Sequence, residues 1–423
     1  MTIDRQSCGS DTPPRAANAV MGANAKAGGG NTDRRSACVQ RMGRASNLSR
    51  VALMRARSDV VEGDASRNLL LDLLRGLAAI AVVALHIGDM VSVRLVPGGY
   101  LAVDFFFVLS GYVIARAYDG RLAGTMTSGR FIGMRLVRLY PLFFAGALLG
   151  LFKTLAQTYL HARFSLEGGH LALAAISNFL MLPYLLPYPS IFPLNAPAWS
   201  LSLELLVNVL YAWLLFRMRT LPLVLIALVA AAAIVAGPFA YGTDRIIGGS
   251  IAHELPFGLA RVFFGFPVGM LIARLPGAAM RRRSALVGTF LAILVLSCLV
   301  LPLSGTAGLI RDLAFVLAIG PIVVWLGAQF EVPQRWSRAA AFLGDLSYPL
   351  YITHYPILLG VTLVGVRRGA PPGVTIAAAM AIALIFAVLI ERYYDAPVRK
   401  WLSSRVRQRE SAPPLSMAIG LNG

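Results

Sequence analysis

The sequence predicts an all-α fold, a polytopic integral membrane bundle of about ten transmembrane helices. Three observations lead to this prediction. Hydrophobic residues make up 57% of the 423-residue chain and charged residues 14%, against roughly 25% charged residues in an average soluble domain. Apolar runs long enough to cross a bilayer recur along the chain. The arginines gather in the polar segments between these runs, as they do in membrane proteins.

The basic composition does not indicate a nucleic-acid-binding protein. The formal net charge is +19, but the basic residues lie in the N-terminal segment and in short loops, which is the distribution that sets membrane topology. The three cysteines, Cys8, Cys38 and Cys298, have no CxxC spacing. We therefore expect no disulfide framework and no metal site.

Residues 1–68 are rich in Arg, Ala, Gly, Ser and Asn and lack a sustained apolar run. Such a segment cannot bury enough apolar surface to offset the entropy lost on ordering, so it is expected to be a disordered tail. Because it also lacks the apolar core of a signal peptide, we expect the first span to direct insertion and the tail to stay in the cytoplasm. Residues 403–423 are expected to form a second disordered cytoplasmic tail.

Residues 69–402 form the predicted membrane domain. Its ten apolar segments of spanning length are residues 73–93, 99–118, 139–158, 199–216, 221–241, 255–274, 284–303, 307–327, 340–363 and 373–394. The segment 159–198 differs from these, because its apolar stretch is short and runs into a proline-rich sequence. We expect a re-entrant or interfacial helix there.

The distribution of basic residues predicts that both termini lie on the cytoplasmic side of the inner membrane. With an even number of spans, the loops on that side carry Arg121, Arg130, Arg135, Arg138, Arg217, Arg219, Arg274, Arg281, Arg282, Arg283, Arg335 and Arg338. The opposite loops carry only Arg94, Arg163, Arg245, Arg367 and Arg368. The C-terminal segment adds Arg399, Lys400, Arg405, Arg407 and Arg409 to the cytoplasmic side.

The first span contains two residues that are costly inside a bilayer. Arg75 and His86 are eleven positions apart, which places them on one face of a helix and about 16.5 Å apart along its axis. Ionisable residues in a span are functional candidates by default. Arg75 could instead be an anchor that reaches the headgroups. His86 could be a structural residue bonded to backbone, but imidazole is the commonest general base and suits proton abstraction from a hydroxyl.

The second polar segment, residues 98–118, contains Asp104, Ser110, Gly111 and Arg116. Asp104 and Arg116 are about 18 Å apart along a helix, so each needs a partner from another helix. Gly111 allows close helix approach, and Ser110 can bond to the preceding turn. Packing is therefore the simpler interpretation of both residues, although Ser110 is also a candidate nucleophile.

The segment 130–141 places Arg135 and Arg138 on one face of a helix. Arginines in this position either contact lipid headgroups or hold phosphate groups through the bidentate guanidinium. On the predicted cytoplasmic side they join Arg75 and Arg116. Four guanidinium groups converging there exceed what topology alone requires.

Glu204 is the only carboxylate of its span, and Trp199 lies about one turn before it. A lone buried carboxylate is costly, so Glu204 could neutralise an arginine. It could equally lie beside His86, either orienting the imidazole or accepting a hydrogen bond from a substrate hydroxyl. The sequence alone leaves both roles open.

His354 lies in the middle of a later span among three tyrosines. A polar aromatic wall of this kind suits either sugar binding or packing, and the sequence does not distinguish them. The tyrosines are Tyr348, Tyr351 and Tyr355. A last polar segment, ERYYDAPVRKWL at residues 391–402, closes the membrane domain.

Taken together, these segments resemble membrane acyltransferase family 3, whose members acylate hydroxyls on surface polysaccharides and other acceptors with cytoplasmic acyl-CoA. Six sequence motifs of the family occur in the family's order between about residues 69 and 402. They are the Arg-x10-His of Arg75 and His86, VDFFFVLSGY at 103–112, RxxRLYP at 135–141, WSLSLE at 199–204, LSYPLYITH at 346–354 and ERYYDAPVRKWL at 391–402.

The resemblance implies roles for His86, Glu204 and four of the arginines. His86 would be catalytic, with Glu204 lining the same site. Arg75, Arg116, Arg135 and Arg138 would bind the donor, acyl-CoA, with acetyl-CoA as the first candidate. The residues expected to contact a carbohydrate or glycolipid acceptor are Asp104, Ser110, Trp199, Tyr351 and His354.

The expected reaction is direct transfer within the bundle, in which His86 takes the acceptor proton and the oxygen attacks the thioester. Membrane lipid and proteins of polysaccharide assembly are the other expected partners, and nucleic acid is not. Two different functions also fit a bundle with embedded charges. One is a proton-coupled transporter or flippase of a polysaccharide precursor, and the other is a structural part of an export machine.

Overall fold

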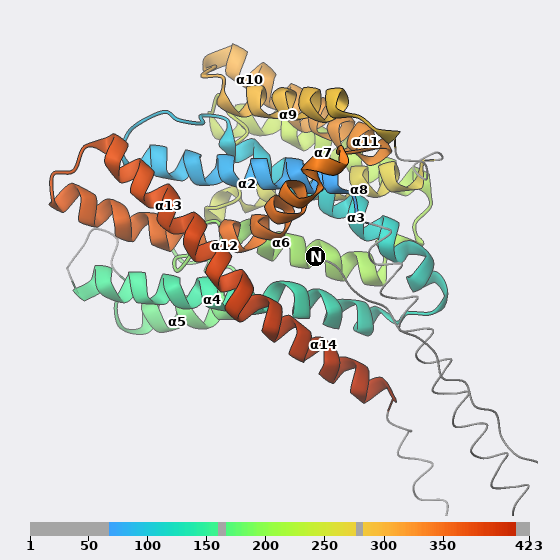
Figure 1. Ribbon diagram of the computed structural model, residues 1–423, viewed down its shortest axis with the longest axis horizontal. Coiled ribbons are helices and arrows are strands. Elements are labelled where there is room, and N and C mark those ends of the chain that lie inside the picture. Colours follow the sequence, from blue (N-terminus) through green and yellow to red (C-terminus); the bar gives the residue numbers. More distant parts are fainter. Residues whose placement is uncertain (1–66, 160–165, 276–281, 412–423) are drawn as a thin grey trace, which may run out of the picture. The chain divides into compact units, whose positions relative to one another are not determined.

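The structure is a computed structural model that describes residues 67–159, 166–275 and 282–411. The described chain is almost entirely helical (Figure 1). Its two strands, β1 (Arg282–Arg283) and β2 (Phe330–Glu331), are two residues long and pair in parallel. The all-α prediction is therefore confirmed. The predicted tail up to residue 66 lies outside the described residues, as do residues 412–423.

Among the described residues, eight helical segments are long and apolar enough to cross a membrane. The helices that form them are α2 (Leu69–Met90), α3 (Ala102–Gly124), α4 (Ser128–Tyr159), α7 (Thr220–Tyr241), α8 (Leu255–Arg274), α10 (Gly305–Ala314) with α11 (Gly320–Gln329), α12 (Ser337–Arg367), and α13 (Pro372–Ile390) with α14 (Ala396–Ser411). Two of the ten predicted spans correspond to shorter apolar helices, α6 (Ala198–Trp213) and α9 (Ala285–Val300). The protein is thus a multi-pass membrane protein.

Two of the spanning segments contain a stretch of π-helix. Phe315–Ile319 joins α10 to α11, and Glu391–Asp395 joins α13 to α14. The helix continues to Ser411, beyond residue 402, where the membrane domain is predicted to end. The residues from 403 to 411 extend the last helix.

The segment that the sequence singles out as re-entrant or interfacial contains a 12-residue helix, α5 (Gly168–Phe179). After it the chain is non-helical up to residue 197. Residues 191–195 of this stretch are buried. Two of their polar groups bond to other segments: the Ile191 amide donates to the Ser250 carbonyl, and the Asn195 side-chain amide donates to the Ile352 carbonyl. Irregular backbone is tolerated within a membrane bundle when protein covers it in this way.

Successive helices run in alternating directions, so their ends gather at two opposite ends of the bundle. We call one of them the basic end. There the Asn68 side chain, at the start of α2, donates to the Gly327 carbonyl near the end of α11, and Arg274, at the end of α8, donates to the Met218 carbonyl between α6 and α7. We call the other the distal end, where the Gly98 amide donates to the Leu299 carbonyl.

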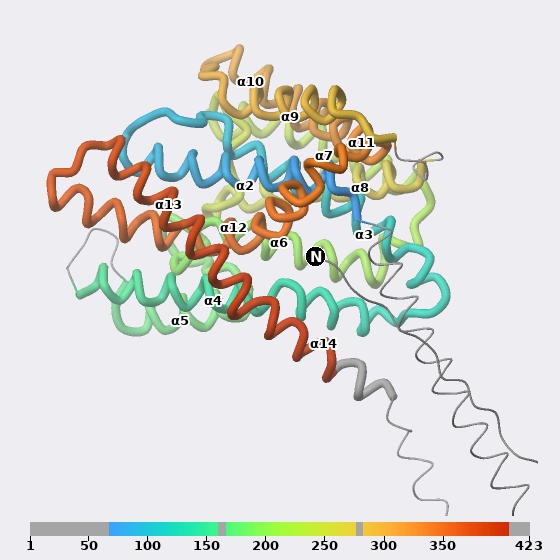
Figure 2. Tube along the Cα trace, in the orientation of Figure 1, coloured from blue at the N-terminus to red at the C-terminus, as the bar shows by residue number. Residues whose placement is uncertain are grey.

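Helix α2 lies beside α12, although about 270 residues separate them in the sequence. Figure 2 shows the blue α2 next to the orange α12. Arg75 on α2 donates to the Ser347 hydroxyl on α12, and His86 contacts His354 on the same helix. The prediction that Arg75 and His86 share one face of their helix is therefore confirmed, because both face α12.

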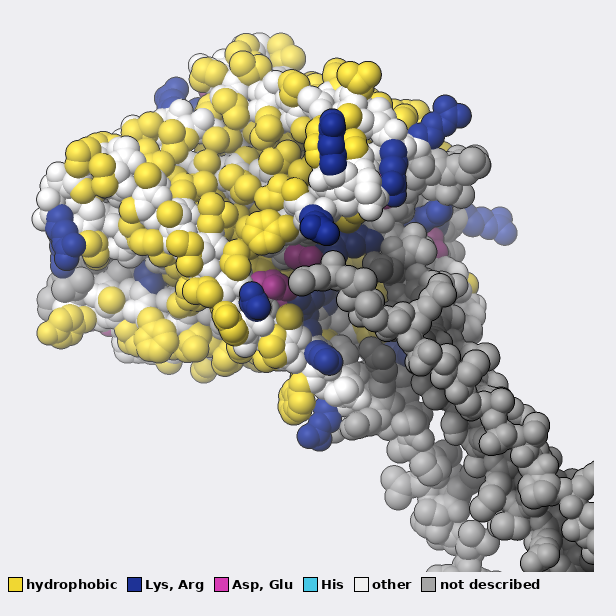
Figure 3. All heavy atoms as spheres, in the orientation of Figure 1, with side chains coloured by type: hydrophobic (Ala, Val, Ile, Leu, Met, Phe, Trp, Pro, Cys, Tyr) yellow, Lys and Arg dark blue, Asp and Glu magenta, His cyan; other side chains and the backbone are white. Residues whose placement is uncertain are grey.

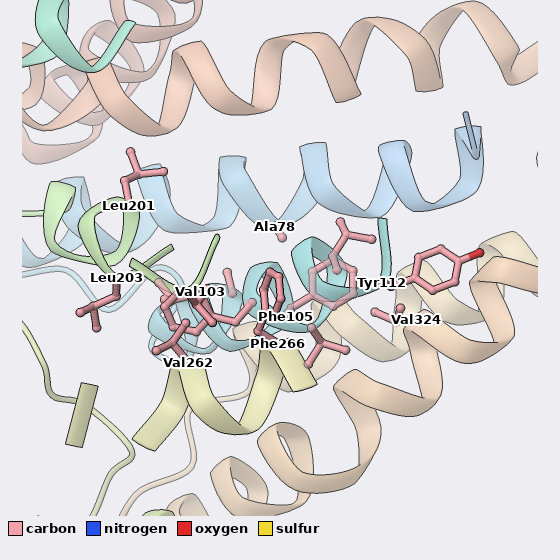
Figure 4. Close-up of a cluster of buried hydrophobic side chains, with 14 of the residues drawn as sticks. Ala78, Val103, Phe105, Tyr112, Leu201, Leu203, Val262, Phe266 and Val324 are labelled. Atoms are coloured by element: carbon pink, nitrogen blue, oxygen red, sulfur yellow. The ribbon is translucent and has the colours of Figure 1, made fainter. Parts of the chain in front are cut away.

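The core that supports the site lies between α3 and its neighbours. In Figure 4, Phe105 and Tyr112 of α3, Phe266 of α8 and Val324 of α11 gather below α2, which contributes Ala78. All five are buried. The surface is apolar over most of the face in Figure 3, with Lys and Arg mostly toward the right of the view. Exposed aliphatic side chains of this kind suit contact with lipid.

Helices α3 and α8 approach at glycines. A Cβ atom added to Gly111 would lie 2.1 Å from the Phe266 carbonyl oxygen, and one added to Gly269 would lie 2.1 Å from the Val108 carbonyl oxygen. The prediction of close approach at Gly111 is thus confirmed. Small residues let helix backbones come together, and dispersion contacts then stabilise the pair.

Replacing either interface glycine is expected to separate these two helices. Gly111→Ala and Gly269→Ala should each lower the free energy of unfolding by about 1–3 kcal/mol, because the added methyl overpacks the contact. Gly120→Ala is the matched control in α3, since it meets no atom within 4 Å. It should instead stabilise slightly, by about 0.5–1 kcal/mol. Unfolding in mixed micelles with rising dodecyl sulfate measures all three, and equal effects would exclude the packing explanation.

Candidate active site

Two cavities enter the bundle from opposite ends. The first, which we call the Arg135 cavity, has a volume of about 160 Å³ and lies toward the basic end. Its walls come from α2, α3, α4, α6 and α12. The lining residues are Arg75, Phe106, Leu109, Ser110, Val113, Ile114, Arg135, Arg138, Leu139, Leu201, Glu204, Ser347, Tyr348 and Tyr351.

The second, which we call the His86 cavity, has a volume of about 550 Å³ and lies toward the distal end. Its walls come from α2, α3, α6, α8, α12 and the distal loops. The polar and aromatic residues that line it are His86, Asp89, Arg94, Tyr100, Ser190, Trp199, Arg245, Ser250, Arg261, Tyr351 and Tyr355.

Tyr351 of α12 lines both cavities and separates them. Its hydroxyl lies 2.6 Å from the Ser200 hydroxyl oxygen of α6 and donates to the Pro197 carbonyl at 3.2 Å. The edge of the Phe106 ring of α3 packs against its ring, with 5.8 Å between centroids. Three helices thus meet at a partition about midway through the bundle.

In the Arg135 cavity, Glu204 accepts two hydrogen bonds at one carboxylate oxygen. The Ser110 hydroxyl donates at 2.8 Å and the Arg135 guanidinium at 3.2 Å. The Arg135 Nε atom is buried and has no hydrogen-bond partner among the described residues. Arg138 lines the same cavity one turn later on α4. With Arg75, which also lines it, the cavity therefore combines three guanidinium groups with one carboxylate.

Arg75 lies at the edge of this cavity and connects two helices. Its guanidinium donates to the Ser347 hydroxyl at 2.9 Å and to the Gly344 carbonyl at 2.8 Å, and it pairs with Asp72 at 2.9 Å. These contacts join α2 to α12. The structure thus brings together Arg75, Arg135 and Arg138 of the predicted donor set, whereas Arg116 is exposed on α3, outside the walls of both cavities.

Of the two alternatives for Glu204, the structure shows the pair with an arginine, and Glu204 and His86 line different cavities. The partner of His86 is His354, whose Nε2 lies 3.1 Å from His86 Nδ1. His354, a predicted acceptor contact, is fully buried and lines neither cavity. Sequence spacing could not pair α2 with α12, because packing between distant segments decides this contact.

Asp104, a predicted acceptor contact, lines neither cavity. It is buried, and its two carboxylate oxygens accept from Arg261 of α8 at 2.9 and 2.7 Å. Arg261 also donates to the Gly248 carbonyl and lies over the Trp199 ring, 5.4 Å from its centroid. Sequence reasoning missed Arg261, although an arginine inside an apolar span was the partner that Asp104 required.

The remaining acceptor candidates lie as follows. Trp199 and Tyr351 line the His86 cavity, while Ser110 lines the Arg135 cavity. Arg94, Arg245 and Asp89, which also line the His86 cavity, were not among the predicted site residues. They belong to loops and helix ends that come together only when the distal end folds, so no local motif marks them.

This arrangement can separate two substrates. The Arg135 cavity offers guanidinium groups for an anionic substrate. The His86 cavity offers an imidazole beside aromatic and polar side chains, which suits a substrate hydroxyl. Tyr351 borders both cavities.

Comparison with known proteins identifies the family. A family model described as an acyltransferase domain matches residues 68–392. The chain is 39% identical to Protein 2 in picA locus of Rhizobium radiobacter over 34% of this chain and 81% of that protein. It is 26% identical to the exopolysaccharide production protein ExoZ of Rhizobium meliloti over 67% of this chain and 84% of ExoZ.

A further relative is the peptidoglycan O-acetyltransferase OatA of Listeria monocytogenes, 26% identical over 78% of this chain and 55% of OatA. No solved structure matches the chain. The family match covers most of the membrane domain and includes both cavities. The chain therefore belongs to membrane acyltransferase family 3 and is a membrane acyltransferase.

Proposed function

We propose that this protein transfers an acyl group, with acetyl as the first candidate, from cytoplasmic acyl-CoA to a hydroxyl of an extracytoplasmic carbohydrate or glycolipid. The observation that carries the proposal is the pair of cavities at opposite ends of one bundle, both bordered by Tyr351. Transfer between substrates on opposite sides of a membrane requires such an arrangement. The names of ExoZ and OatA support a polysaccharide acceptor.

The Arg135 cavity is the proposed donor site. Its arginines suit the phosphates of CoA, because a guanidinium binds phosphate oxygens in a bidentate manner. Most basic loops lie at the same end, which the positive-inside rule assigns to the cytoplasm. In this orientation both termini are cytoplasmic, and the protein lies in the inner membrane.

The His86 cavity is the proposed acceptor site. His86 accepts the proton of the acceptor hydroxyl, and the oxygen attacks the thioester carbonyl carbon. The carbon–sulfur bond then breaks, and the proton held by His86 passes to the departing CoA sulfur. The products are an ester and CoA thiol, so atoms and charge balance without any other reactant.

The thioester must pass the Tyr351 partition to meet His86. Arg75 and His86 are about 16.5 Å apart along α2, a distance that the pantetheine arm of CoA can bridge. The side chains at this partition are those of Tyr351, Ser200 and Phe106, and the Tyr351 hydroxyl also donates to the Pro197 carbonyl. Joining the two cavities would require the Tyr351 side chain to move away from these contacts.

Reconstitution in lipid vesicles tests the proposal. The full chain is incubated with ¹⁴C-acetyl-CoA and surface glycan from cells that lack the gene. We expect label in the glycan and one CoA thiol per ester formed. A transporter or flippase would move glycan across the vesicle without forming thiol. Thiol release without labelled glycan would contradict the proposed acceptor class.

Arginine substitutions test the donor site. Arg138→Ala and Arg135→Ala should each raise the KM for acetyl-CoA about tenfold or more, because hydrogen bonds to charged groups are worth about 1.5–3 kcal/mol. The KM for the acceptor should stay unchanged. Arg130→Ala is the matched control on α4, since Arg130 is exposed and outside both cavities. If Arg130→Ala raises the KM equally, general surface charge would explain the effect.

A further inference from the structure

We propose that His354 is a positioning residue for His86: it accepts a hydrogen bond from His86 Nδ1 and thereby holds His86 Nε2 ready as the base. This inference rests on the proposed function, in which His86 takes the acceptor proton. His354 is fully buried in α12 and lines neither cavity. It therefore acts through His86 and not on a substrate.

The backbone determines which nitrogen of His354 carries the proton. Its Nδ1 lies 2.7 Å from the Tyr351 carbonyl oxygen and 3.1 Å from the Leu350 carbonyl oxygen. A carbonyl oxygen can only accept a hydrogen bond, so Nδ1 must be the donor. In the neutral ring, Nε2 then has a lone pair, and this atom faces His86.

The same reasoning applies to His86. Its Nδ1 lies 3.0 Å from the Val82 carbonyl oxygen and 3.1 Å from His354 Nε2. Both neighbours are acceptors, so the proton of neutral His86 is on Nδ1 and the lone pair is on Nε2. The Tyr355 ring contacts the imidazole edge-on, with 5.3 Å between centroids. Helix α12 thus restricts both the tautomer and the orientation of His86.

This arrangement also favours the charged state that forms during the reaction. When His86 takes a proton at Nε2, its Nδ1–H becomes a charged donor, and hydrogen bonds from charged donors are roughly twice as strong as neutral ones. His354 Nε2 receives that stronger bond. The buried His354 ring and the carbonyls of Val82, Leu350 and Tyr351 thus perform the orienting role that a carboxylate performs in many triads.

Two isosteric substitutions separate positioning from general packing. In His354→Gln, the amide oxygen can take the place of Nε2 and still accept from His86. In His354→Asn, the shorter amide takes the place of Nδ1 and can donate to the Tyr351 carbonyl, but it does not reach His86. We expect His354→Gln to keep kcat within a few-fold of the original, and His354→Asn and His354→Ala to lose about 10²-fold. The KM for acetyl-CoA should not change.

A spectroscopic readout tests the hydrogen bond without any turnover. The full chain, labelled with ¹⁵N-histidine, is reconstituted in lipid, and the ring signals of His86 are assigned by their loss in His86→Ala. We expect the protonated nitrogen of neutral His86 to be Nδ1, with a nitrogen–nitrogen coupling to His354 Nε2. The coupling should disappear in His354→Asn.

Failure of the positioning role and failure of the proposed function give different results. Protonation of His86 at Nε2, or equal kcat values for His354→Gln and His354→Asn, would overturn the positioning role. The expected spectrum together with the expected kcat values supports it. If no acyl-CoA is consumed at all, the proposed function fails, and the spectrum still decides whether His354 is hydrogen-bonded to His86.

Discussion

His86→Ala should lower kcat for acyl transfer by about 10²–10⁴-fold, because general-base catalysis contributes that much to such reactions. The KM for acetyl-CoA should change little, since His86 lies in the cavity away from Arg135 and Arg138. CoA thiol release by the purified full chain in lipid measures both quantities. The amount of the His86→Ala variant found in the membrane shows whether it folds.

Two further measurements make this prediction specific. His253→Ala is the control at the distal end, because that side chain is 70% exposed and does not line the His86 cavity. Its kcat should match the original. Added imidazole should partly restore activity to His86→Ala, since truncation enlarges a cavity that already measures about 550 Å³. Full turnover by His86→Ala without imidazole would exclude His86 as the base.

The buried ion pair between Asp104 and Arg261 is expected to contribute strongly to the stability of the fold. Removing Asp104 leaves the guanidinium of Arg261 buried without a counter-charge, because Arg261 is 2% exposed and Asp104 3% exposed. Breaking a buried ion pair on one side costs about 3–5 kcal/mol. We therefore expect Asp104→Leu to lower the free energy of unfolding by that amount, and the loss should be measurable in mixed micelles.

The double variant Asp104→Leu/Arg261→Met should recover more than half of that loss, because it removes both buried charges together. Asp244→Ala is the control, since Asp244 is 54% exposed and its pair with Arg245 is long, at 3.9 Å. Exposed pairs contribute only about 0–1 kcal/mol. A double variant no more stable than Asp104→Leu would mean that packing, and not charge, dominates at this site.

The contrast between Arg135 and Arg116 shows how far the sequence could specify the donor site. Both are arginines near the same predicted membrane face. On α4, Arg135 turns into the bundle and bonds to Glu204, whereas Arg116 remains exposed on α3. The hydrophobic pattern around each residue does not reveal this difference, because it depends on which neighbouring helix covers that face.

Glu204 illustrates the same limit. Its isolation in an apolar span indicates that it needs a partner, and the sequence offered His86 and an arginine. The structure selects Arg135, with Ser110 as a second donor. Ser110 thereby takes part in the Arg135 cavity, where its hydroxyl helps to hold the carboxylate beside the guanidinium.

The sequence by itself determined that this protein is a multi-pass helical bundle, that Arg75 and His86 share one helix face, and that the chain resembles membrane acyltransferases. These features follow from hydrophobicity and helix periodicity, which are local. Only the tertiary structure decided that His354, and not Glu204, pairs with His86, and that Tyr351 separates two cavities. Such contacts join helices far apart in the chain, and close packing between them selects one set of partners.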